Sequence, residues 1–379
     1  MTATGVRRIC YLSGTRADFG LMRRTLQAAA RLADLSVIAT GTHLEPSFGN
    51  TVDEITAAGL RIAARVPVDV RTRTAQSMSA GIGECLIGVT RALGEEAPHA
   101  LLLLGDRGEM LAGATAALHL GIPAIHIHGG ERSGTVDEPV RHAISKLSAL
   151  HFVATQESRQ RLERMGEEAD RIFVTGAPGL DGLDEAASLS PVSLREALGL
   201  PLEQPFVLVL FHPVVQQAGA ARDQTLALLQ ALNDTGLPVL WLDPNADAGS
   251  LEILGALDSQ ALPQGSRRVK HLDRATFCSA MRHCAVMAGN SSAGIIEAAT
   301  FGTPVVNVGD RQRLRERNDN VTDSPPERAA VFAALVAALA RGRWPCDNRY
   351  GDGMTAQRIA NLLAELTLPA TLLEKANTY

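Results

Sequence analysis

The feature that most constrains the fold is a regular alternation of short apolar runs with helical patterns. The clearest run is Ala-Leu-Leu-Leu-Leu at residues 100–104, which is continuously apolar. Strands that are buried on both faces have this pattern, and they occur in parallel sheets covered by helices. No hairpin signal joins one run to the next, so we expect a parallel sheet of the α/β class. Further strands of this sheet are expected at residues 7–12, 35–40, 122–128, 150–154 and 172–175.

Residues 176–182 divide the chain into two halves. Their sequence, Gly-Ala-Pro-Gly-Leu-Asp-Gly, is rich in turn formers and predicts a linker. The alternation then starts again, with strands expected at residues 206–210, 239–242, 267–271, 285–288 and 305–308. The predicted fold is therefore α/β, with two Rossmann-like, doubly wound parallel-sheet domains at residues 1–178 and 179–361.

The turn Gly289-Asn-Ser-Ser292 is the first candidate for a binding site. It follows an apolar run and precedes a predicted helix, residues 293–300, that carries Glu297. The serines supply hydroxyls, and the start of a helix presents unpaired N–H groups, a combination that suits a phosphate. Arg311 is expected nearby, because parallel strands end at one edge of a sheet. Taken alone, the turn is explained equally well as a helix cap.

A second group of ionisable residues follows the strands of the first half. Its members are Asp106, Arg107, His128, Glu131, Asp137 and Arg141. Crowding of such groups at strand ends is typical of an active site. Asp137 and Arg141 are one helical turn apart, so they either share a face directed at the site or form only a surface ion pair. Arg16, which follows the first strand, is a further candidate for binding phosphate.

Composition excludes several classes of function. The net charge of −5 argues against nucleic acid as a partner. The five cysteines are odd in number and lack CxxC spacing, so we expect reduced thiols and no zinc site. No run of ~18 apolar residues predicts a membrane span, and residues 1–8 do not lead into a signal-peptide core, so we expect a cytoplasmic protein. No metal and no cofactor are expected.

Several blocks of sequence, taken in order, carry a resemblance to a known family. The blocks are Gly14-Thr-Arg-Ala-Asp-Phe-Gly, Gly105-Asp-Arg, His-Gly-Gly-Glu131, Asp137-Glu-Pro-Val-Arg-His-Ala-Ile-Ser-Lys-Leu-Ser, Pro244-Asn-Ala-Asp-Ala-Gly-Ser and Gly289-Asn-Ser-Ser-Ala-Gly-Ile-Ile-Glu. Together they resemble the hydrolysing UDP-N-acetylglucosamine 2-epimerases. The resemblance implies a glycosyltransferase-B arrangement with a cleft between the domains, and a C-terminal helix, residues 362–379, that returns to the first domain.

The same resemblance implies where the substrate binds and how it reacts. It assigns the UDP-sugar to His212, Asn245, Ser291, Ser292, Glu297 and Arg311, with Arg16 and Arg107 from the first domain. We add Arg141 to these binding residues. The implied reaction is loss of UDP with the C2 proton, which forms a 2-acetamidoglucal, followed by addition of water to give the free C2 epimer.

This chemistry needs side chains that take and return a proton, and Asp106, Asp137, His128 and Glu131 are the candidates. Many members of the family carry Glu where this chain has His128. Either the histidine takes over proton transfer, since it titrates near neutrality, or Glu131 or Asp106 carries it. Leu21 stands where non-hydrolysing relatives have Lys, which favours the hydrolysing branch.

The main hypothesis is a hydrolysing UDP-N-acetylglucosamine 2-epimerase that makes N-acetylmannosamine for nonulosonic (sialic-type) acid synthesis. The nearest alternative is the same chemistry on UDP-2,4-diacetamido-2,4,6-trideoxyglucose, for legionaminic acid. A glycosyltransferase of the same fold and a catalytically silent nucleotide-sugar sensor are more distant alternatives. The protein is also expected to form a homodimer or homotetramer.

Overall fold

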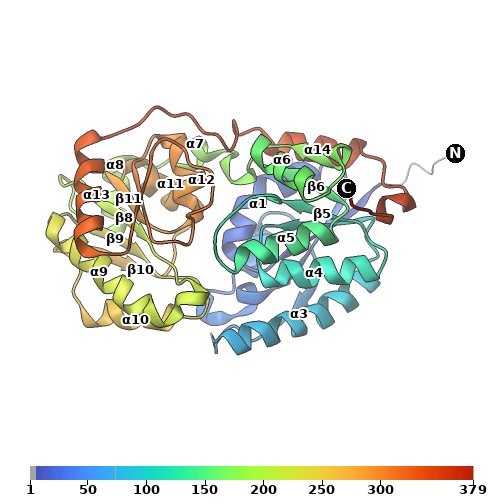
Figure 1. Cartoon of the computed structure of the whole chain (residues 1–379), viewed down its shortest axis with the longest axis horizontal. Coiled ribbons are helices and arrows are strands. Elements are labelled where there is room, and N and C mark those ends of the chain that lie inside the picture. The colour runs from blue at the N-terminus through green and yellow to red at the C-terminus, as the bar shows by residue number, and fades with distance from the viewer. Residues whose placement is uncertain (1–5, 73, 379) are drawn as a thin grey trace.

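The computed structural model describes residues 6–72 and 74–378 and has two lobes, each built on one sheet (Figure 1). The first sheet has seven parallel strands in the order β3-β2-β1-β4-β5-β6-β7. Its strands are β1 (Arg8–Ser13), β2 (Asp34–Thr40), β3 (Arg61–Val66), β4 (Ala100–Leu104), β5 (Ala124–Ile127), β6 (Leu150–Val153) and β7 (Ile172–Val174).

The second sheet has six parallel strands in the order β10-β9-β8-β11-β12-β13. Its strands are β8 (Val207–Leu210), β9 (Val239–Leu242), β10 (Arg267–Val269), β11 (Val286–Gly289), β12 (Val305–Val308) and β13 (Val321–Ser324). In both sheets the strand order reverses beside the first strand of the domain, as in a doubly wound fold. The predicted fold class is confirmed.

Helices cover both faces of each sheet. The first domain contains α1 (Arg16–Ala29), α2 (Val52–Ala57), α3 (Ala75–Glu96), α4 (Gly108–His119), α5 (Asp137–Leu147) and α6 (Gln156–Arg164). The second contains α7 (Leu183–Ala186), α8 (Pro191–Leu198), α9 (Ala221–Thr235), α10 (Ser250–Ser259), α11 (Arg274–His283), α12 (Ser292–Ile296) and α13 (Arg328–Arg341). Among the described helices, none is long and apolar enough to cross a membrane.

Successive side chains of the central strands pack into two separate hydrophobic cores, one on each face of the sheet. In β1, Ile9 and Tyr11 pack with α1, whereas Cys10 and Leu12 pack with α3 and α4. A strand sends successive side chains to opposite faces, so a strand covered on both sides must be apolar throughout. This is why the continuous run in β4 was such a strong signal.

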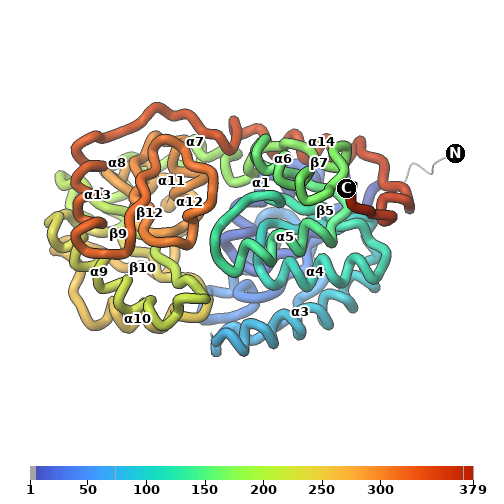
Figure 2. The backbone as a smooth tube through the Cα atoms, in the orientation of Figure 1, coloured from blue at the N-terminus to red at the C-terminus, as the bar shows by residue number. Residues whose placement is uncertain are grey.

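The chain passes between the lobes twice (Figure 2). The first crossing includes the short 3-10 helix η4 (Pro178–Leu180), within the expected linker. The second follows α13 and ends in α14 (Thr355–Glu365), where Ile359 and Leu363 join the core beneath α1. The returning helix therefore lies earlier in the chain than the expected 362–379, because its apolar face, not the chain end, docks on α1. We keep the boundary near residue 178 as a proposed domain division, and because Ile359 and Leu363 lie in the core of the first domain, we propose that the second domain ends before α14.

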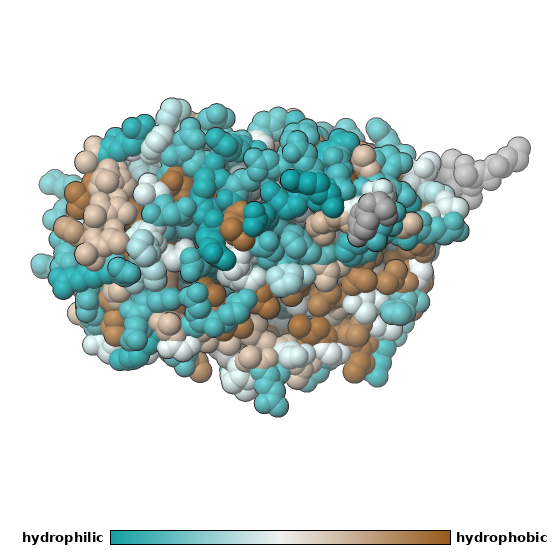
Figure 3. All heavy atoms as spheres, in the orientation of Figure 1, coloured by the Kyte–Doolittle hydropathy of each residue, from teal (hydrophilic) through white to brown (hydrophobic). Residues whose placement is uncertain are grey.

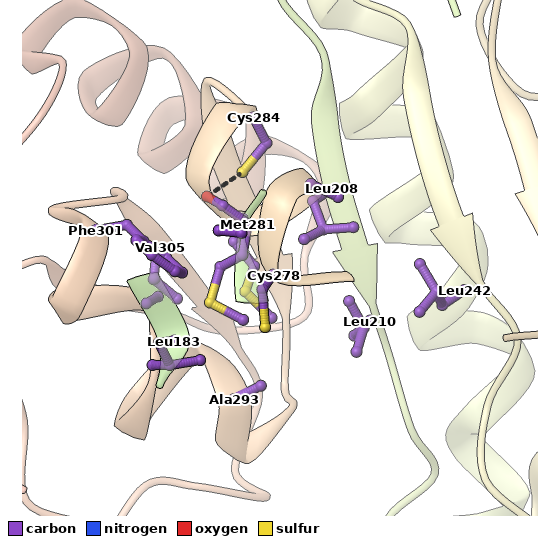
Figure 4. Packing of buried hydrophobic residues seen from close by; sticks show 14 of the residues in the cluster. Leu183, Leu208, Leu210, Leu242, Cys278, Met281, Cys284, Ala293, Phe301 and Val305 are labelled. Atoms are coloured by element: carbon purple, nitrogen blue, oxygen red, sulfur yellow. Dashed lines mark hydrogen bonds between the residues drawn. The ribbon is translucent and has the colours of Figure 1, made fainter. Parts of the chain in front are cut away.

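The hydrophobic core of the second domain near the start of α12 contains two of the five cysteines. Figure 4 shows Cys278 and Cys284 packed with Met281, Leu208 and Leu210. Burial raises the pKa of both thiols to about 12, so they remain protonated and unreactive at neutral pH. All five cysteines are free, as expected, and four of them are buried.

The outer surface is mainly hydrophilic on the face shown in Figure 3. Apolar side chains gather there over α3 and α4. Ile87 on α3, with Leu118 and Leu120 at the end of α4, are exposed large apolar residues.

Candidate active site

The first-domain half of the site begins where β4 ends. Gly105 has a positive φ of 82°, which turns the chain sharply and places Asp106 and Arg107 before α4. Asp106 forms an ion pair with Arg141, which comes from α5 and is only 1% exposed. Of the two alternatives for Arg141, a surface ion pair with Asp137 is not observed. Arg141 points into the domain, where the carboxylates of Asp106 and Glu131 compensate its charge.

Glu131 lies at the centre of a buried charge cluster. It is 3% exposed and pairs with Arg141, whose Nη1 is 3.5 Å from Glu131 Oε2, and with Arg315 of the second domain. His128 Nδ1 contacts the other carboxylate oxygen. Burial opposes ionisation of Glu131, but the charges of Arg315 and His128 outweigh it and lower the pKa to about 2. Glu131 is therefore ionised at neutral pH.

The ionised state of Glu131 fixes the tautomer of His128. A carboxylate accepts but cannot donate, so the proton lies on His128 Nδ1. Among the described residues, no hydrogen bond to His128 Nε2 is present, and the backbone holds a positive φ of 65° that brings the ring onto Glu131. His128 and Glu131 together therefore form a dyad in which the carboxylate orients the imidazole.

His126, two residues earlier on β5, has a structural role. Its Nε2 donates to the carbonyl of Gly105 at 2.7 Å, and its Nδ1 accepts from Ser145 at 2.9 Å. Burial lowers its pKa to about 3, so the ring is neutral. It braces the turn that carries Asp106, and both nitrogens are already used. The described residues also contain no cluster of three or more His, Cys, Asp or Glu placed to hold a metal ion.

The second-domain half is built on the turn after β11. Gly289 has a φ of 127°, and a Cβ there would lie 2.0 Å from the carbonyl oxygen of Leu210. Asn290 does not cap the following helix. Its side chain accepts from the backbone N–H of His212 at 2.7 Å and donates to the His212 carbonyl at 2.8 Å. The turn and the end of β8 are therefore locked together.

Arg311 lies beside this turn, as the sequence predicts, and donates to the Asn290 carbonyl at 3.1 Å. Ser291 caps α12 through an acceptor contact of 3.3 Å from the N–H of Ala293. The α-helix ends at Ile296, just before Glu297, and the 3-10 helix η6 (Ala298–Phe301) covers the rest of the expected range 293–300. The carbonyl of Ile296 accepts from the side chain of Asn348, not from a later N–H of the helix.

His212 connects the turn to the loop after β9. Its Nδ1 accepts from the backbone N–H of Asn245 at 3.2 Å, so Nε2 carries the proton. Burial and the positive charges of Arg311 and Arg107 lower the pKa of His212 to about 3. It is a neutral donor suited to an anionic oxygen. Asn245 in turn donates to Asp247.

A cavity of about 350 Å³ lies where the two halves meet. Asp106, Arg107 and Asp137 line it from the first domain, and Asp247 and Arg311 line it from the second. Arg107 bridges the cleft to Asp247, with 3.4 Å between Nη2 and Oδ1. The rest of the wall is largely apolar and includes Val68, Val70, Met78, Ile82, Val136 and Val140.

Asp137 is the one cavity carboxylate that has no side-chain partner among the described residues. Its backbone N–H contacts Thr135 Oγ1 at 3.4 Å, and no hydrogen bond of its carboxylate is present among the described residues. It is half-buried at the first residue of α5 and faces the positive field of Arg107, Arg311 and Arg315. A free carboxylate beside cations is well placed to accept a proton from a bound molecule.

Some candidate residues are not joined to this cavity. Arg16 pairs with Glu54, with Nε and Oε1 2.7 Å apart. Glu297 is held by Arg274 from α11 at 2.7 Å. Several other candidates do not line the cavity: Ser291, Ser292, His212 and Asn245 of the second domain, and His128, Glu131 and Arg141 of the first.

Three residues of the site were missed from the sequence: Asp247, Arg274 and Arg315. Asp247 stands in the block Pro244-Asn-Ala-Asp, which is part of the family resemblance, but the sequence alone does not mark it as a site residue. Arg315 lies among Arg311, Arg313 and Arg317, so the sequence offers no signal that distinguishes it.

Comparison with known proteins identifies the family. Residues 24–364 match the family model described as UDP-N-acetylglucosamine 2-epimerase. The chain is 45% identical over 376 residues to a UDP-N,N'-diacetylbacillosamine 2-epimerase (hydrolyzing) from Legionella pneumophila, which covers 99% of this chain and 100% of that protein. It is 31% identical to a UDP-N-acetylglucosamine 2-epimerase from Neisseria meningitidis, over 97% of this chain and 96% of the relative.

A solved structure agrees with the arrangement of the two domains. The crystal structure of UDP-GlcNAc 2-epimerase from Neisseria meningitidis, bound to UDP-GlcNAc, superposes with a TM-score of 0.79 at 17% identity. The match covers 95% of this chain and 100% of that one, which confirms the predicted two-domain fold. The chain therefore belongs to the UDP-N-acetylglucosamine 2-epimerase family and is a UDP-sugar 2-epimerase.

Proposed function

We propose that this enzyme is of the hydrolysing type and releases UDP together with a free C2-epimerised sugar. In the first step the C1–O bond to UDP breaks, the diphosphate keeps the bonding electrons and a base takes the C2 proton. In the second step water adds its hydroxyl to C1 and a proton returns to C2 from the opposite face. Two proton-transfer groups are needed, because removal and return occur on different faces.

The observation that carries this proposal is the placement of Asp106, Asp137, Arg107 and Arg311 around one interdomain cavity. Asp137 is the first proton-transfer group, because it is free and half-buried. Asp106 lines the same cavity and is the first candidate for the second group. His128, with an unbonded Nε2, is the other candidate. Glu131 serves as the carboxylate that orients His128.

The diphosphate is proposed to bind on the second-domain turn. Ser291, Ser292 and the Nε2–H of His212 supply hydrogen-bond donors, and Arg311 supplies charge. Arg107 is placed to stabilise the leaving diphosphate from the other side of the cleft. Glu297, which forms an ion pair with Arg274, is proposed to bind the ribose hydroxyls. Arg16 and Asn245 remain proposed contacts at the edges of the site.

The sugar is proposed to be UDP-2,4-diacetamido-2,4,6-trideoxyglucose or a close isomer. The 45% identical relative supports this choice. The apolar residues of the cavity wall also suit a sugar whose C6 is a methyl group, because burying a hydroxyl there without a partner is costly. UDP-N-acetylglucosamine, with the 31% identical relative behind it, is the second candidate.

The test is to supply each UDP-sugar to the purified enzyme and to compare kcat/KM from coupled UDP release. We expect the diacetamido sugar to be preferred by at least ~10-fold, about the discrimination that one buried polar group supplies. Equal or better turnover of UDP-N-acetylglucosamine would move the assignment to that substrate. UDP release that needs an added acceptor would contradict the epimerase reaction itself.

A cytoplasmic location, a role in nonulosonic acid synthesis and a homodimeric or homotetrameric state complete the proposal. The pathway follows from the chemistry, since a free 2-epimer is a building block for condensation into a nine-carbon acid. Light scattering of the purified protein tests the oligomeric state directly.

A further inference from the structure

We propose that Arg315 is a positioning residue for the reaction: from the nucleotide-binding domain it crosses the cleft to Glu131, and so assembles the proton-transfer groups only when the two domains meet. This inference rests on the proposed function. Arg315 does not line the cavity, and its ion pair is with Glu131, not with a residue of the turn at Ser291 and Ser292. It acts through Glu131.

The loop that carries Arg315 is docked on the first domain at several points. The N–H of Leu314 donates to the carbonyl of Ser133 at 3.4 Å. Thr155 of the first domain donates to Glu316 at 2.6 Å. Gly134 packs so closely that a Cβ there would lie 3.2 Å from Arg313. The approach of Arg315 to Glu131 is therefore part of a specific interface.

Charge counting shows what Arg315 contributes. Asp106 and Glu131 supply two negative charges, and Arg141 and Arg315 supply two positive charges, so the four-residue cluster is neutral. Three of the four side chains are at least nine-tenths buried: Glu131 and Arg141 almost completely, and Arg315 with 9% exposed. Without Arg315, two carboxylates would share one guanidinium, and a buried cluster with net charge is strongly unfavourable.

The consequence reaches the reacting groups along two routes. Glu131, once deprived of Arg315, draws Arg141 towards itself and away from Asp106, which lines the cavity. The loss of Arg315 also removes the positive charge that most lowers the pKa of Glu131, so Glu131 would take up a proton at a higher pH. Each route disturbs the carboxylates and the imidazole that Arg315 helps to hold in place.

The same loop also touches the nucleotide side. Arg311, four residues before Arg315, donates to the Asn290 carbonyl at the diphosphate turn. One short segment therefore connects the place where UDP is proposed to bind with the cluster that orients the base. The charged or titratable groups that face Glu131 are His128, Arg141, Arg315, Glu316 and Tyr350.

The test compares Arg315→Met with Arg315→Lys and with Arg328→Met, a control that removes an exposed guanidinium from α13 of the same domain. For Arg315→Met we expect kcat to fall roughly 10- to 100-fold, with KM and the Kd for UDP changed less than ~3-fold. The acid limb of the kcat profile should move to higher pH. Arg315→Lys should recover much of kcat, and Arg328→Met should match the wild type.

Hydrogen exchange supplies a readout that does not need turnover. In the protein saturated with UDP, the amides of residues 131–136 should exchange faster in Arg315→Met than in the wild type. If Arg315→Met does not fold, the same kinetic and exchange measurements on Arg315→Lys test the inference. We expect kcat and the exchange rates of Arg315→Lys to change in the same direction, by a smaller amount.

Two results would overturn the inference. One is an unchanged kcat and pH profile together with unchanged exchange. The other is a parallel rise in KM and in the Kd for UDP at constant kcat, which would make Arg315 a nucleotide contact. A wild-type enzyme that releases no UDP from any sugar would refute the proposed function. The hydrogen-exchange comparison would still test whether Arg315 joins the two domains, because it does not depend on turnover.

Discussion

Replacing Glu131 by Gln should weaken the fold measurably, and in a pH-dependent way. The carboxylate compensates two guanidinium groups inside the protein, those of Arg141 and Arg315. Its pKa lies at about 2, against an ordinary value of 4.5. At ~1.4 kcal/mol per pKa unit, this difference corresponds to roughly 3 kcal/mol in favour of the folded state at neutral pH. Leaving both arginines without their carboxylate puts the total cost at about 3–5 kcal/mol.

The pH dependence follows from the direction of the pKa change. A carboxylate with a lowered pKa in the folded state stabilises the protein above pH 4.5, and this contribution is lost as the pH falls from 4.5 towards about 2. Between neutral pH and about pH 3.5, the wild type should lose about 1.4 kcal/mol through this group, a loss that Glu131→Gln cannot show. Urea unfolding at the two pH values measures the difference.

A matched control is Glu157→Gln, which removes an exposed carboxylate from α6. Its free energy of unfolding should stay within ~0.5 kcal/mol of the wild type. The reasoning fails if Glu131→Gln is as stable as the wild type and has the same pH dependence. A fully stable but inactive Glu131→Gln would assign direct proton transfer to Glu131 instead.

The other predictions concern catalysis, binding, metal and thiols. Asp106→Asn should lower kcat roughly 10²-fold or more while calorimetry finds the Kd for UDP nearly unchanged, and a matching loss of UDP affinity would contradict this division. Arg311→Ala should raise KM and the Kd for UDP together, as measured by steady-state kinetics and calorimetry. Treatment with EDTA should leave kcat unchanged, whereas a loss that a divalent ion restores would reveal a metal requirement. A thiol reagent should label only Cys346 in the folded protein, since it is the one exposed cysteine among the described residues. Rapid reaction of two or more thiols would contradict the buried positions of the other four cysteines.

The central strands could be predicted closely because their environment leaves few choices. The expected ranges for β4, β9 and β12 coincide with the observed strands. Two of the four edge strands, β3 and β13, were missed, because they are partly exposed and their sequences mix polar with apolar residues. A continuous apolar run exists only where both faces of a strand are covered.

In the candidate site, features set by the local sequence could be predicted, whereas contacts between distant parts of the chain could not. The turn that holds Asp106 and the turn that holds Ser291 could be predicted, since strand ends in a parallel sheet meet at one edge. The partners of Glu131 could not. Arg315 approaches from a different domain, and nothing local in a loop with four arginines indicates which one is buried. The shortened α12 likewise depends on Asn348, more than fifty residues away along the chain.

The most direct test of the account is product analysis by NMR in D₂O with the UDP-sugar that turns over best. We expect UDP and free sugar in equal amounts, with the sugar inverted at C2 and carrying deuterium there, because the C2 proton is exchanged with solvent before water adds. A product that keeps its nucleotide would place the enzyme among the non-hydrolysing 2-epimerases. A free sugar with unchanged configuration and hydrogen retained at C2 would contradict the central claim, since it requires only hydrolysis at C1 and no proton transfer at C2.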